Sequence, residues 1–204
     1  MPESSGKNTV ERAREIIQQE AEGILSLLEQ MNHSLEQAVE MLAGCSGHVL
    51  VTGTGTSRFV AQRFSHLLCC CGVPSLFINA ADSLHGGAGA ITPNDVIFVI
   101  SKGGRSSEIN HFAEIAKARG AKVIALSEKT DSPLAETVDL VLQVIAPGDV
   151  DPYGMIATGS SLANSAICDA LCVLLLEKKG YTKEKFGETH PGGAVGKKLK
   201  QEMV

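Results

Sequence analysis

The sequence predicts an α/β fold in which helices cover both faces of a five-stranded, parallel, doubly wound sheet, a three-layer arrangement of the flavodoxin type. Short apolar segments rich in β-branched residues alternate with longer segments of helical periodicity. The apolar segments show little polar alternation, which is typical of strands buried on both faces. With 204 residues, 44% of them hydrophobic, the chain suffices for one α/β domain over residues 48–204 and a helical extension over residues 1–47.

The N-terminal extension is expected to form two helices. Asn8 and Glu11 have the spacing of an N-cap and its N3 partner, so the first helix is expected to begin there. Segment 32–34 breaks it, and a second helix is expected over residues 34–44. Nothing nearby in the sequence covers the apolar stripe of the first helix. We therefore expect the helix to pack on another subunit as well as on its own domain, and the protein to be a homo-oligomer, a dimer or a tetramer. The stripe consists of Val10, Ala13, Ile17, Ala21, Ile24, Leu28 and Met31.

The other elements follow from apolar runs and from the residues that end them. Strands are expected over residues 48–52, 74–79, 96–100, 122–126 and 139–145. Helices are expected from the loop at 53–58 through residue 71 and over residues 106–119, 133–137, 158–179 and 182–186. Residues 80–92 are expected to form a loop region with room for a short helix, and residues 189–199 close the chain without an expected element.

The stretch DVIFVISKGGRSSEI, residues 95–109, carries the main candidate site. In open α/β sheets, ligands bind beyond the carboxyl ends of the strands, where this loop lies. Its glycines let the backbone approach a ligand, and Ser106 can cap a helix whose free N–H groups attract a phosphate. Glu108 in the first helical turn is a candidate base. The candidate phosphate-binding residues here are Ser101, Gly103, Gly104, Ser106 and Ser107.

A second loop of the same kind, GTGTSR, follows the first expected strand. It does not fit a dinucleotide site, because Arg58 stands where the third glycine is needed and no acidic residue ends the next strand. Two interpretations stay open, a phosphate or sugar loop and a simple tight turn. The candidate ligand residues are Gly53, Gly55, Thr56 and Ser57.

Isolated polar residues give weaker signals. His85 can be a polar residue packed under a loop, whereas His190 precedes Pro-Gly-Gly, which fixes the backbone and permits close approach to a ligand or another chain. Asp149 lies in a long loop at the carboxyl edge of the sheet, so a site role competes there with a solvated turn. Lys102 and Arg105 are either site cations or solvent-facing charges.

Composition argues against several classes of partner. A net charge of -5 without a long Lys/Arg block argues against nucleic acid. No apolar run is expected to reach membrane-span length and the N-terminus has no signal-like apolar region, so a cytoplasmic protein without a membrane partner is expected. Six cysteines lack a Cys-x-x-Cys pair, and the consecutive run 69–71 cannot chelate one metal, so reduced thiols and no metal site are expected.

Four segments together resemble the sugar isomerase (SIS) domain family and, within it, the arabinose 5-phosphate isomerases. They are SLHGGAG, DVIFVISKGGRSSEI, DPYGMIATGSSLANSAICDAL and HPGGAVGKKL, and the resemblance spans residues 48–200. It implies a five-stranded parallel sheet, tetramers with active sites at subunit interfaces, and aldose–ketose isomerisation of a phosphorylated sugar, such as arabinose 5-phosphate and ribulose 5-phosphate. No cofactor is needed for this chemistry. The resemblance also implies phosphate binding by the Ser/Gly loop and by hydroxyls near Thr158.

The resemblance assigns roles to individual residues. Glu108 matches a catalytic glutamate, and His190 matches the histidine of the HPGG motif. His85 matches a substrate-site histidine that can also bind inhibitory metal. Asp149 aligns with a second catalytic glutamate and is one methylene shorter, which makes it an assisting catalytic residue.

The sequence also departs from the family pattern. The first glycine loop has a lysine in the family where Thr56 stands, and a glycine where Arg58 stands. Gly103 replaces a phosphate-loop serine, Arg105 replaces a glutamate and Gly87 replaces an aspartate. The paired CBS domains that often follow are absent from the sequence.

Two alternatives therefore remain beside an arabinose 5-phosphate isomerase. One is a SIS isomerase for another sugar phosphate of six or seven carbons, and the HPGG ending speaks against it. The other is a non-catalytic sugar-phosphate-binding module, as in SIS regulators, which usually carry an N-terminal helix-turn-helix. Glu108 and His190 favour an enzyme, and the missing lysine favours a binder.

Overall fold

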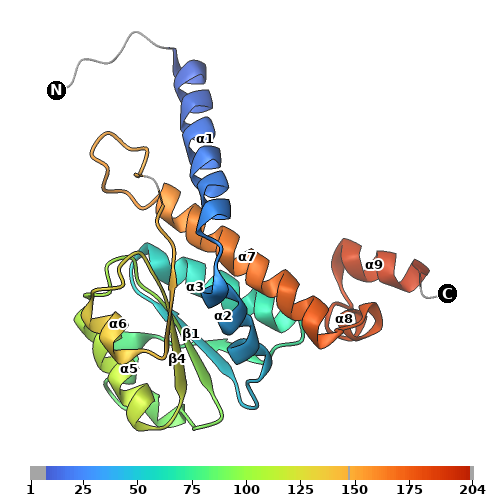
Figure 1. The fold of residues 1–204 in the computed structure, drawn as a ribbon. Coiled ribbons are helices and arrows are strands. Elements are labelled where there is room, and N and C mark those ends of the chain that lie inside the picture. The colour runs from blue at the N-terminus through green and yellow to red at the C-terminus, as the bar shows by residue number, and fades with distance from the viewer. Residues whose placement is uncertain (1–7, 147, 203–204) are drawn as a thin grey trace.

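The computed structural model describes residues 8–146 and 148–202 and contains one five-stranded parallel sheet. The strand order is β2-β1-β3-β4-β5, which is the doubly wound order of the flavodoxin type, so the expected fold class is confirmed. Figure 1 shows the sheet between two layers of helices. The strands are β1 Val49–Gly53, β2 Ser75–Phe77, β3 Val96–Ile100, β4 Lys122–Ser127 and β5 Leu140–Gln143.

Two hydrophobic cores lie on the two faces of this sheet. On one face, side chains such as Val51 and Phe98 pack with helices α2 His33–Ala43, α3 Thr56–Cys70 and α7 Gly159–Lys179. On the other, Leu50 and Val99 belong to the core that includes α5 Ser107–Ala118 and neighbours the short helices α4 Ala80–Ser83 and α6 Pro133–Thr137. Alternate residues of one strand thus enter opposite cores, which explains why the strands lack polar alternation.

The N-terminal helix ends earlier than the sequence predicts. Helix α1 spans Thr9–Leu25 and begins with the expected capping box of Asn8 and Glu11, but the chain then tightens into a 3-10 helix, η1 Ser26–Gln30. Helix α2 begins one residue before the expected start, because the Asn32 side chain accepts a hydrogen bond from the Ser34 N–H and acts as the N-cap. In Figure 1, α1 extends away from the α/β body. Six residues of its stripe and the following turn are exposed: Val10, Ile17, Ile24, Leu25, Leu28 and Met31.

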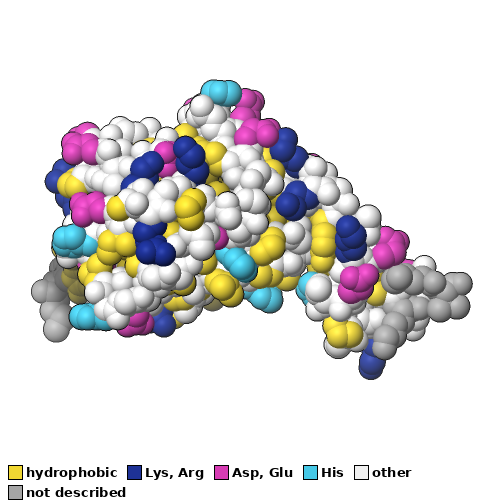
Figure 2. Space-filling view, turned by 90° about the horizontal axis from the view of Figure 1, so that it is seen from below, with side chains coloured by type: hydrophobic (Ala, Val, Ile, Leu, Met, Phe, Trp, Pro, Cys, Tyr) yellow, Lys and Arg dark blue, Asp and Glu magenta, His cyan; other side chains and the backbone are white. Residues whose placement is uncertain are grey.

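The C-terminal part runs along α7 and then turns outward. By length and composition alone, α7 is the one helix of the described residues that could cross a membrane, so the expectation that no apolar run has this length is wrong. Eight of its residues are buried, as expected for a core helix of a globular domain. Two shorter helices follow, α8 Lys183–Thr189 and α9 Gly193–Glu202, and α9 was not expected. They project from one end of the body (Figures 1 and 2).

The surface charge is mixed on the face that Figure 2 shows. Lys and Arg side chains there are scattered among acidic and apolar ones and form no continuous basic area among the residues drawn in colour.

The segment expected to be a loop with a short helix contains two short helical elements. They are α4 and the 3-10 helix η2 Gly87–Ala90.

Candidate active site

The two glycine loops lie next to each other at the point where the strand order reverses. β1 and β3 are neighbours, and Gly53 is in register with Ile100, so both strands end at the same level. This crevice is where doubly wound sheets bind ligands. Gly55 (φ 56°) and Gly104 (φ 62°) adopt the left-handed conformation that glycine tolerates, and a Cβ on Gly104 would lie 2.2 Å from Ser132 Oγ. The sequence therefore needs glycine to shape both loops.

The loop after β3 is held firmly at its start and open at its end. The Ser101 N–H donates to Leu126 O at 3.0 Å, and the Lys102 carbonyl accepts from the Glu128 N–H at 3.0 Å. Ser106 occupies the N-cap position of α5 as expected, but its side chain makes no capping hydrogen bond. The first N–H groups of α5 and the Ser106 hydroxyl therefore remain available to an anion.

Glu108 lies in the first turn of α5, directly after these donors. The residue is half-buried, and its Oε2 accepts a hydrogen bond from Ser107 Oγ at 3.3 Å. A carboxylate at this place is stabilised by the helix dipole and adjoins the uncapped N–H groups of α5. The geometry thus supports the expected pairing of an anion site with a candidate base.

The loop after β1 presents its hydroxyls in the first turn of α3. Thr56 is exposed, Ser57 is half-buried, and Gly55 is the N-cap residue without a side-chain cap. The preceding Thr52 is buried, and its Oγ1 has no hydrogen-bond partner within the described part of the chain. The loop can therefore contribute N–H and hydroxyl groups to a ligand in the same crevice.

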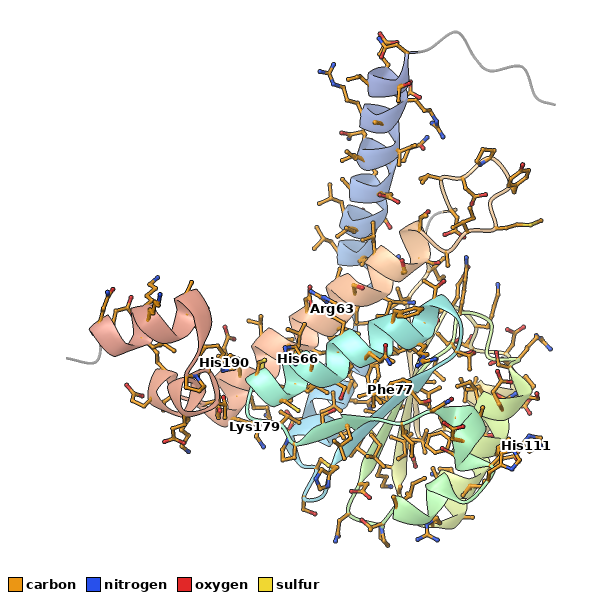
Figure 3. All side chains as sticks on the ribbon, turned by 180° about the vertical axis from the view of Figure 1, so that it is seen from behind. Arg63, His66, Phe77, His111, Lys179 and His190 are labelled. Carbon is orange, nitrogen blue, oxygen red and sulfur yellow. The ribbon has the colours of Figure 1, made fainter. Side chains whose placement is uncertain are left out.

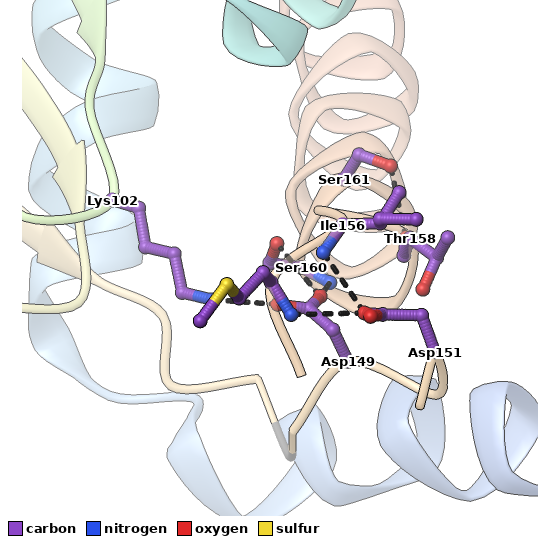
Figure 4. A network of polar contacts seen from close by, with 8 residues as sticks. Lys102, Asp149, Asp151, Ile156, Thr158, Ser160 and Ser161 are labelled. Carbon is purple, nitrogen blue, oxygen red and sulfur yellow. Dashed lines mark hydrogen bonds and ion pairs between the residues drawn. The ribbon is translucent and has the colours of Figure 1, made fainter. Parts of the chain in front are cut away.

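A polar network joins the β3 loop to the N-terminus of α7 (Figure 4). Lys102 Nζ lies 3.0 Å from Asp149 Oδ2, and Asp149 Oδ1 accepts from both the N–H and the Oγ of Ser160 at 3.3 Å. The Asp149 side chain is only 3% exposed, whereas that of Lys102 is 47% exposed. Asp149 is therefore not the solvated turn residue that the sequence left open.

Thr158 lies beside this network at the N-cap of α7. Its side chain makes no capping hydrogen bond, and its Oγ1 is buried without a partner among residues 8–146 and 148–202. An unpaired buried hydroxyl costs about 1–3 kcal/mol. A ligand or a water molecule that reached this oxygen would recover that free energy, so Thr158 fits a binding role.

The segment between Asp149 and Thr158 is shaped by a second carboxylate. Partial desolvation would raise the pKa of Asp151, but three backbone N–H groups donate to its oxygens and hold that pKa below its usual value. The donors are those of Tyr153, Met155 and Ile156, at 2.8–2.9 Å. Asp151 thus organises the turn that leads into α7.

His190 lies far from these loops within one chain. It follows α8 beyond the C-terminal end of α7, and Figure 3 shows it near Lys179, on the opposite side of the molecule from His111 of α5. The 21 residues of α7 alone span about 30 Å. His85 is exposed on the turn after α4. One chain therefore does not bring His190 together with Glu108.

Hollows of the surface do not by themselves identify the site. One of ≈440 Å³ lies between α2 and the start of β5, at the amino edge of the sheet. Another, of ≈430 Å³, lies between α1 and residues 148–150, beside Asp149. No group of three or more His, Cys, Asp or Glu side chains in the described ranges could hold a metal ion. The candidate active site is therefore assigned from the polar residues at the carboxyl edge of the sheet.

The sequence did not identify two residues of the candidate site, Ser160 and Thr52. Ser160 binds Asp149, and Thr52 leaves a buried hydroxyl at the end of β1. The signal for Ser160 was its position just inside an apolar helix, where hydroxyl and N–H groups are free to bind a carboxylate. Thr52 gave only the weaker signal of a hydroxyl in an otherwise apolar strand.

The comparisons with known proteins agree on one family. The family model described as the SIS domain matches residues 41–185. The chain is 34% identical over 186 residues to arabinose 5-phosphate isomerase KdsD of Salmonella typhi and 33% identical over 186 residues to that of Escherichia coli K12. These alignments cover 91% of this chain and 57% of each relative, so the chain spans little more than half the length of these curated relatives.

Solved structures show the same fold. A putative sugar-phosphate isomerase from Listeria monocytogenes is 33% identical with a TM-score of 0.87, and the match covers 92% of this chain and all of that one. A protein of Escherichia coli CFT073, solved in complex with arabinose 5-phosphate, is 24% identical with a TM-score of 0.87, over 91% of this chain and all of that one. The similarity to this second protein, at 24% identity, shows only that the two proteins share a fold.

Proposed function

Because the chain belongs to the SIS domain family, we propose that it is a sugar-phosphate isomerase that interconverts an aldose phosphate and a ketose phosphate. The observation that carries the proposal is the position of Glu108, in the first turn of α5 beside the N–H groups and hydroxyls of the β3 loop. A phosphate held there places the carbon chain of the sugar within reach of a carboxylate.

In the proposed reaction, Glu108 moves a proton between C1 and C2 through an enediol. The N-terminus of α5 and Ser101, Ser106 and Thr158 bind the phosphate and fix the position of the sugar. His190 transfers the oxygen protons or opens the sugar ring, and Asp149 assists. General acid–base groups of this kind contribute about 10²- to 10⁴-fold to a rate.

A complete site of this kind requires a second copy of the chain. His190 lies on the opposite side of the molecule from His111 of α5, the helix that carries Glu108, and the stripe of α1 and η1 is exposed, with Ile17 67% and Leu28 71% accessible. We therefore propose a homo-oligomer, a dimer or a tetramer, in which His190 of one chain reaches the glycine loops of another.

A cytoplasmic location is also part of this proposal. It is supported by six free cysteines, three of them buried.

The proposed substrate pair is arabinose 5-phosphate and ribulose 5-phosphate. The reason is that relatives about one third identical to this chain are named arabinose 5-phosphate isomerase. The test is a coupled assay of purified protein on C5 to C7 aldose and ketose phosphates, with proton exchange at C1 and C2 followed by NMR in deuterated water. Turnover of the C5 pair supports the proposal. A sugar phosphate that binds without any exchange would contradict it and favour a non-catalytic binding module.

A further inference from the structure

Lys102 is fixed at the carboxyl edge of the sheet by its own backbone. Its carbonyl accepts hydrogen bonds from the Glu128 N–H at 3.0 Å and from Ser127 Oγ at 3.3 Å, and these donors are the last residue of β4 and the residue after it. The neighbouring Ser101 N–H bonds to Leu126 O. The lysine stem therefore begins from a rigid point in the crevice.

Asp149 holds the other end of that side chain, so its assisting role is exerted through Lys102. Its two oxygens bind the Lys102 ammonium and two donors of Ser160, and the carboxylate is nearly inaccessible. A carboxylate buried in this way is stable only while its cation stays in place, because an unpaired buried charge costs several kcal/mol. These contacts indicate that Asp149 positions the Lys102 side chain.

The Lys102 ammonium keeps donors that Asp149 does not use. An ammonium group has three N–H donors, and Asp149 uses one of them. The Lys102 side chain is 47% exposed, begins in the loop that leads into α5 and reaches Asp149, which binds Ser160 in the first turn of α7. The same two helix starts carry the uncapped N–H groups of α5 and the unpaired Thr158 hydroxyl, both of which can bind an anion.

We propose that Lys102 binds the phosphate group of the sugar-phosphate ligand and that Asp149 is the positioning residue that keeps the Lys102 ammonium in place. The inference rests on the proposed function and adds to it the cation of the same site. A lysine ammonium is a strongly hydrated point charge on a flexible stem, so without a fixed partner it would give little directional binding. Asp149 supplies that fixed partner and stays shielded from the ligand by the ammonium.

The chain offers a matched control at the opposite end of α5. Lys117 forms an ion pair with Asp139, whose other oxygen accepts the Val123 N–H at 2.8 Å, but this pair lies at the amino edge of the sheet. Lys117→Met thus removes a lysine from a partly buried carboxylate, which keeps a second cation, Lys122, at 3.7 Å. It tests what the loss of a structural ion pair alone does to ligand binding.

The experiment compares Lys102→Met, Lys102→Arg and Lys117→Met by calorimetric titration with inorganic phosphate and with arabinose 5-phosphate. We expect Lys102→Met to weaken both ligands by about tenfold or more, Lys102→Arg to recover part of the affinity, and Lys117→Met to change it less than about twofold. Thermal unfolding identifies loss of structure. Equal affinities in Lys102→Met and Lys117→Met overturn the proposal.

Asp149 is tested through its dependence on Lys102. If Asp149 acts only by holding the lysine, Asp149→Asn lowers phosphate affinity, and the double variant Lys102→Met/Asp149→Asn binds phosphate as weakly as Lys102→Met but not more weakly. The double variant also removes both charges, so it leaves no unpaired buried charge. Losses that simply add, or a fall in kcat with unchanged affinity, contradict the positioning role.

Failure of this inference is distinguishable from failure of the proposed function. Phosphate binding is measured without turnover, and isomerase activity is measured on the wild-type protein. If the wild type is active and Lys102→Met changes phosphate affinity no more than Lys117→Met does, only the inference about Lys102 is contradicted. Phosphate binding that depends on Lys102 in a protein without activity removes only the catalytic proposal.

Discussion

The imidazole of His190 stacks on the ring of Phe186, with ring centroids 3.8 Å apart and an interplanar angle of 12°, while His190 Nδ1 lies 2.9 Å from the Phe186 carbonyl oxygen. A carbonyl oxygen can only accept, so this contact favours the tautomer with the hydrogen on Nδ1, and the Thr189 hydroxyl lies 3.0 Å from the same nitrogen. The neutral ring then has its lone pair on Nε2. The single chain thus holds the His190 imidazole in a fixed position beyond the C-terminal end of α7, away from Glu108.

The first prediction follows from this tautomer. His190→Asn removes the Nε2 lone pair, and we expect kcat to fall by about 10²-fold or more, the ordinary contribution of a positioned acid–base group. The loss should be larger for sugars that are mostly closed rings. Phe186→Leu keeps the carbonyl and should cost less. Steady-state kinetics on a ring-forming and an open-chain substrate measure this, and unchanged turnover in His190→Asn would remove His190 from the mechanism.

A second prediction tests whether the site combines two chains. Glu108→Gln and His190→Asn homomers should each be inactive, whereas co-expressed mixtures should regain roughly a quarter of wild-type activity, because in half of the randomly formed dimers one of two sites has both intact residues. Activity of purified hybrids measures this. Mixtures as inactive as the separate variants would show that both residues do not meet across an interface.

The third prediction separates catalysis from binding. Glu108→Gln keeps size and hydrogen bonding but removes the base, so sugar-phosphate affinity should stay nearly intact while turnover falls by about two to four orders of magnitude. Glu114→Gln, on an exposed position of the same helix, is the control and should be fully active. Calorimetric titration and the coupled assay give both quantities. A parallel loss of affinity and rate would assign Glu108 to binding.

Local signals in the sequence were enough to predict the sheet and its loops. The strand Val96–Ile100 agrees residue for residue with its prediction, because five apolar residues end at a hydroxyl and glycine loop. Helix Pro133–Thr137 also agrees, since Ser132 caps it and Pro133 fixes its first turn. The helix near the C-terminus was missed because Gly193 and Gly196 obscure its helical pattern.

Long-range relationships could not be predicted in this way. Lys102 and Asp149 are 47 residues apart, and only the folded sheet and α7 bring them together. His190 was expected at the same site as Glu108, but the length of α7 separates them within one chain. A sequence pattern specifies residue types and local geometry, whereas it does not state which chain contributes a residue.

The fourth prediction concerns the exposed stripe of α1 and η1. If this stripe packs on another copy, Ile17→Glu and Leu28→Glu place a charge in an apolar interface and should lower the sedimentation coefficient to that of a smaller species at micromolar concentration. Gln18→Glu adds the same charge beside the stripe and should leave the assembly unchanged. A wild-type protein that sediments as a monomer would contradict the homo-oligomer.

The last prediction concerns acid stability and the buried carboxylate of Asp95. Burial alone would raise the pKa of Asp95, but hydrogen bonds from the His48 N–H at 2.7 Å and from the N–H and Oγ1 of Thr92 at 2.7 and 2.9 Å outweigh burial and lower that pKa. Because the folded-state pKa lies below the unfolded one, the stabilisation is present above the unfolded pKa of about 3.9 and is lost as the pH falls through the folded pKa.

Asp95→Asn should therefore lower the free energy of unfolding by about 1–3 kcal/mol at pH 7, since one of its donors then faces an amide NH₂ group. The difference from wild type should shrink as the pH falls below about 3.9. Urea unfolding at fixed protein concentration at pH 7 and pH 3 measures both values, with Asp131→Asn on an exposed turn as the control. An equal loss at both pH values would mean that the ionised form of Asp95 contributes nothing and that its packing alone stabilises the edge of the sheet.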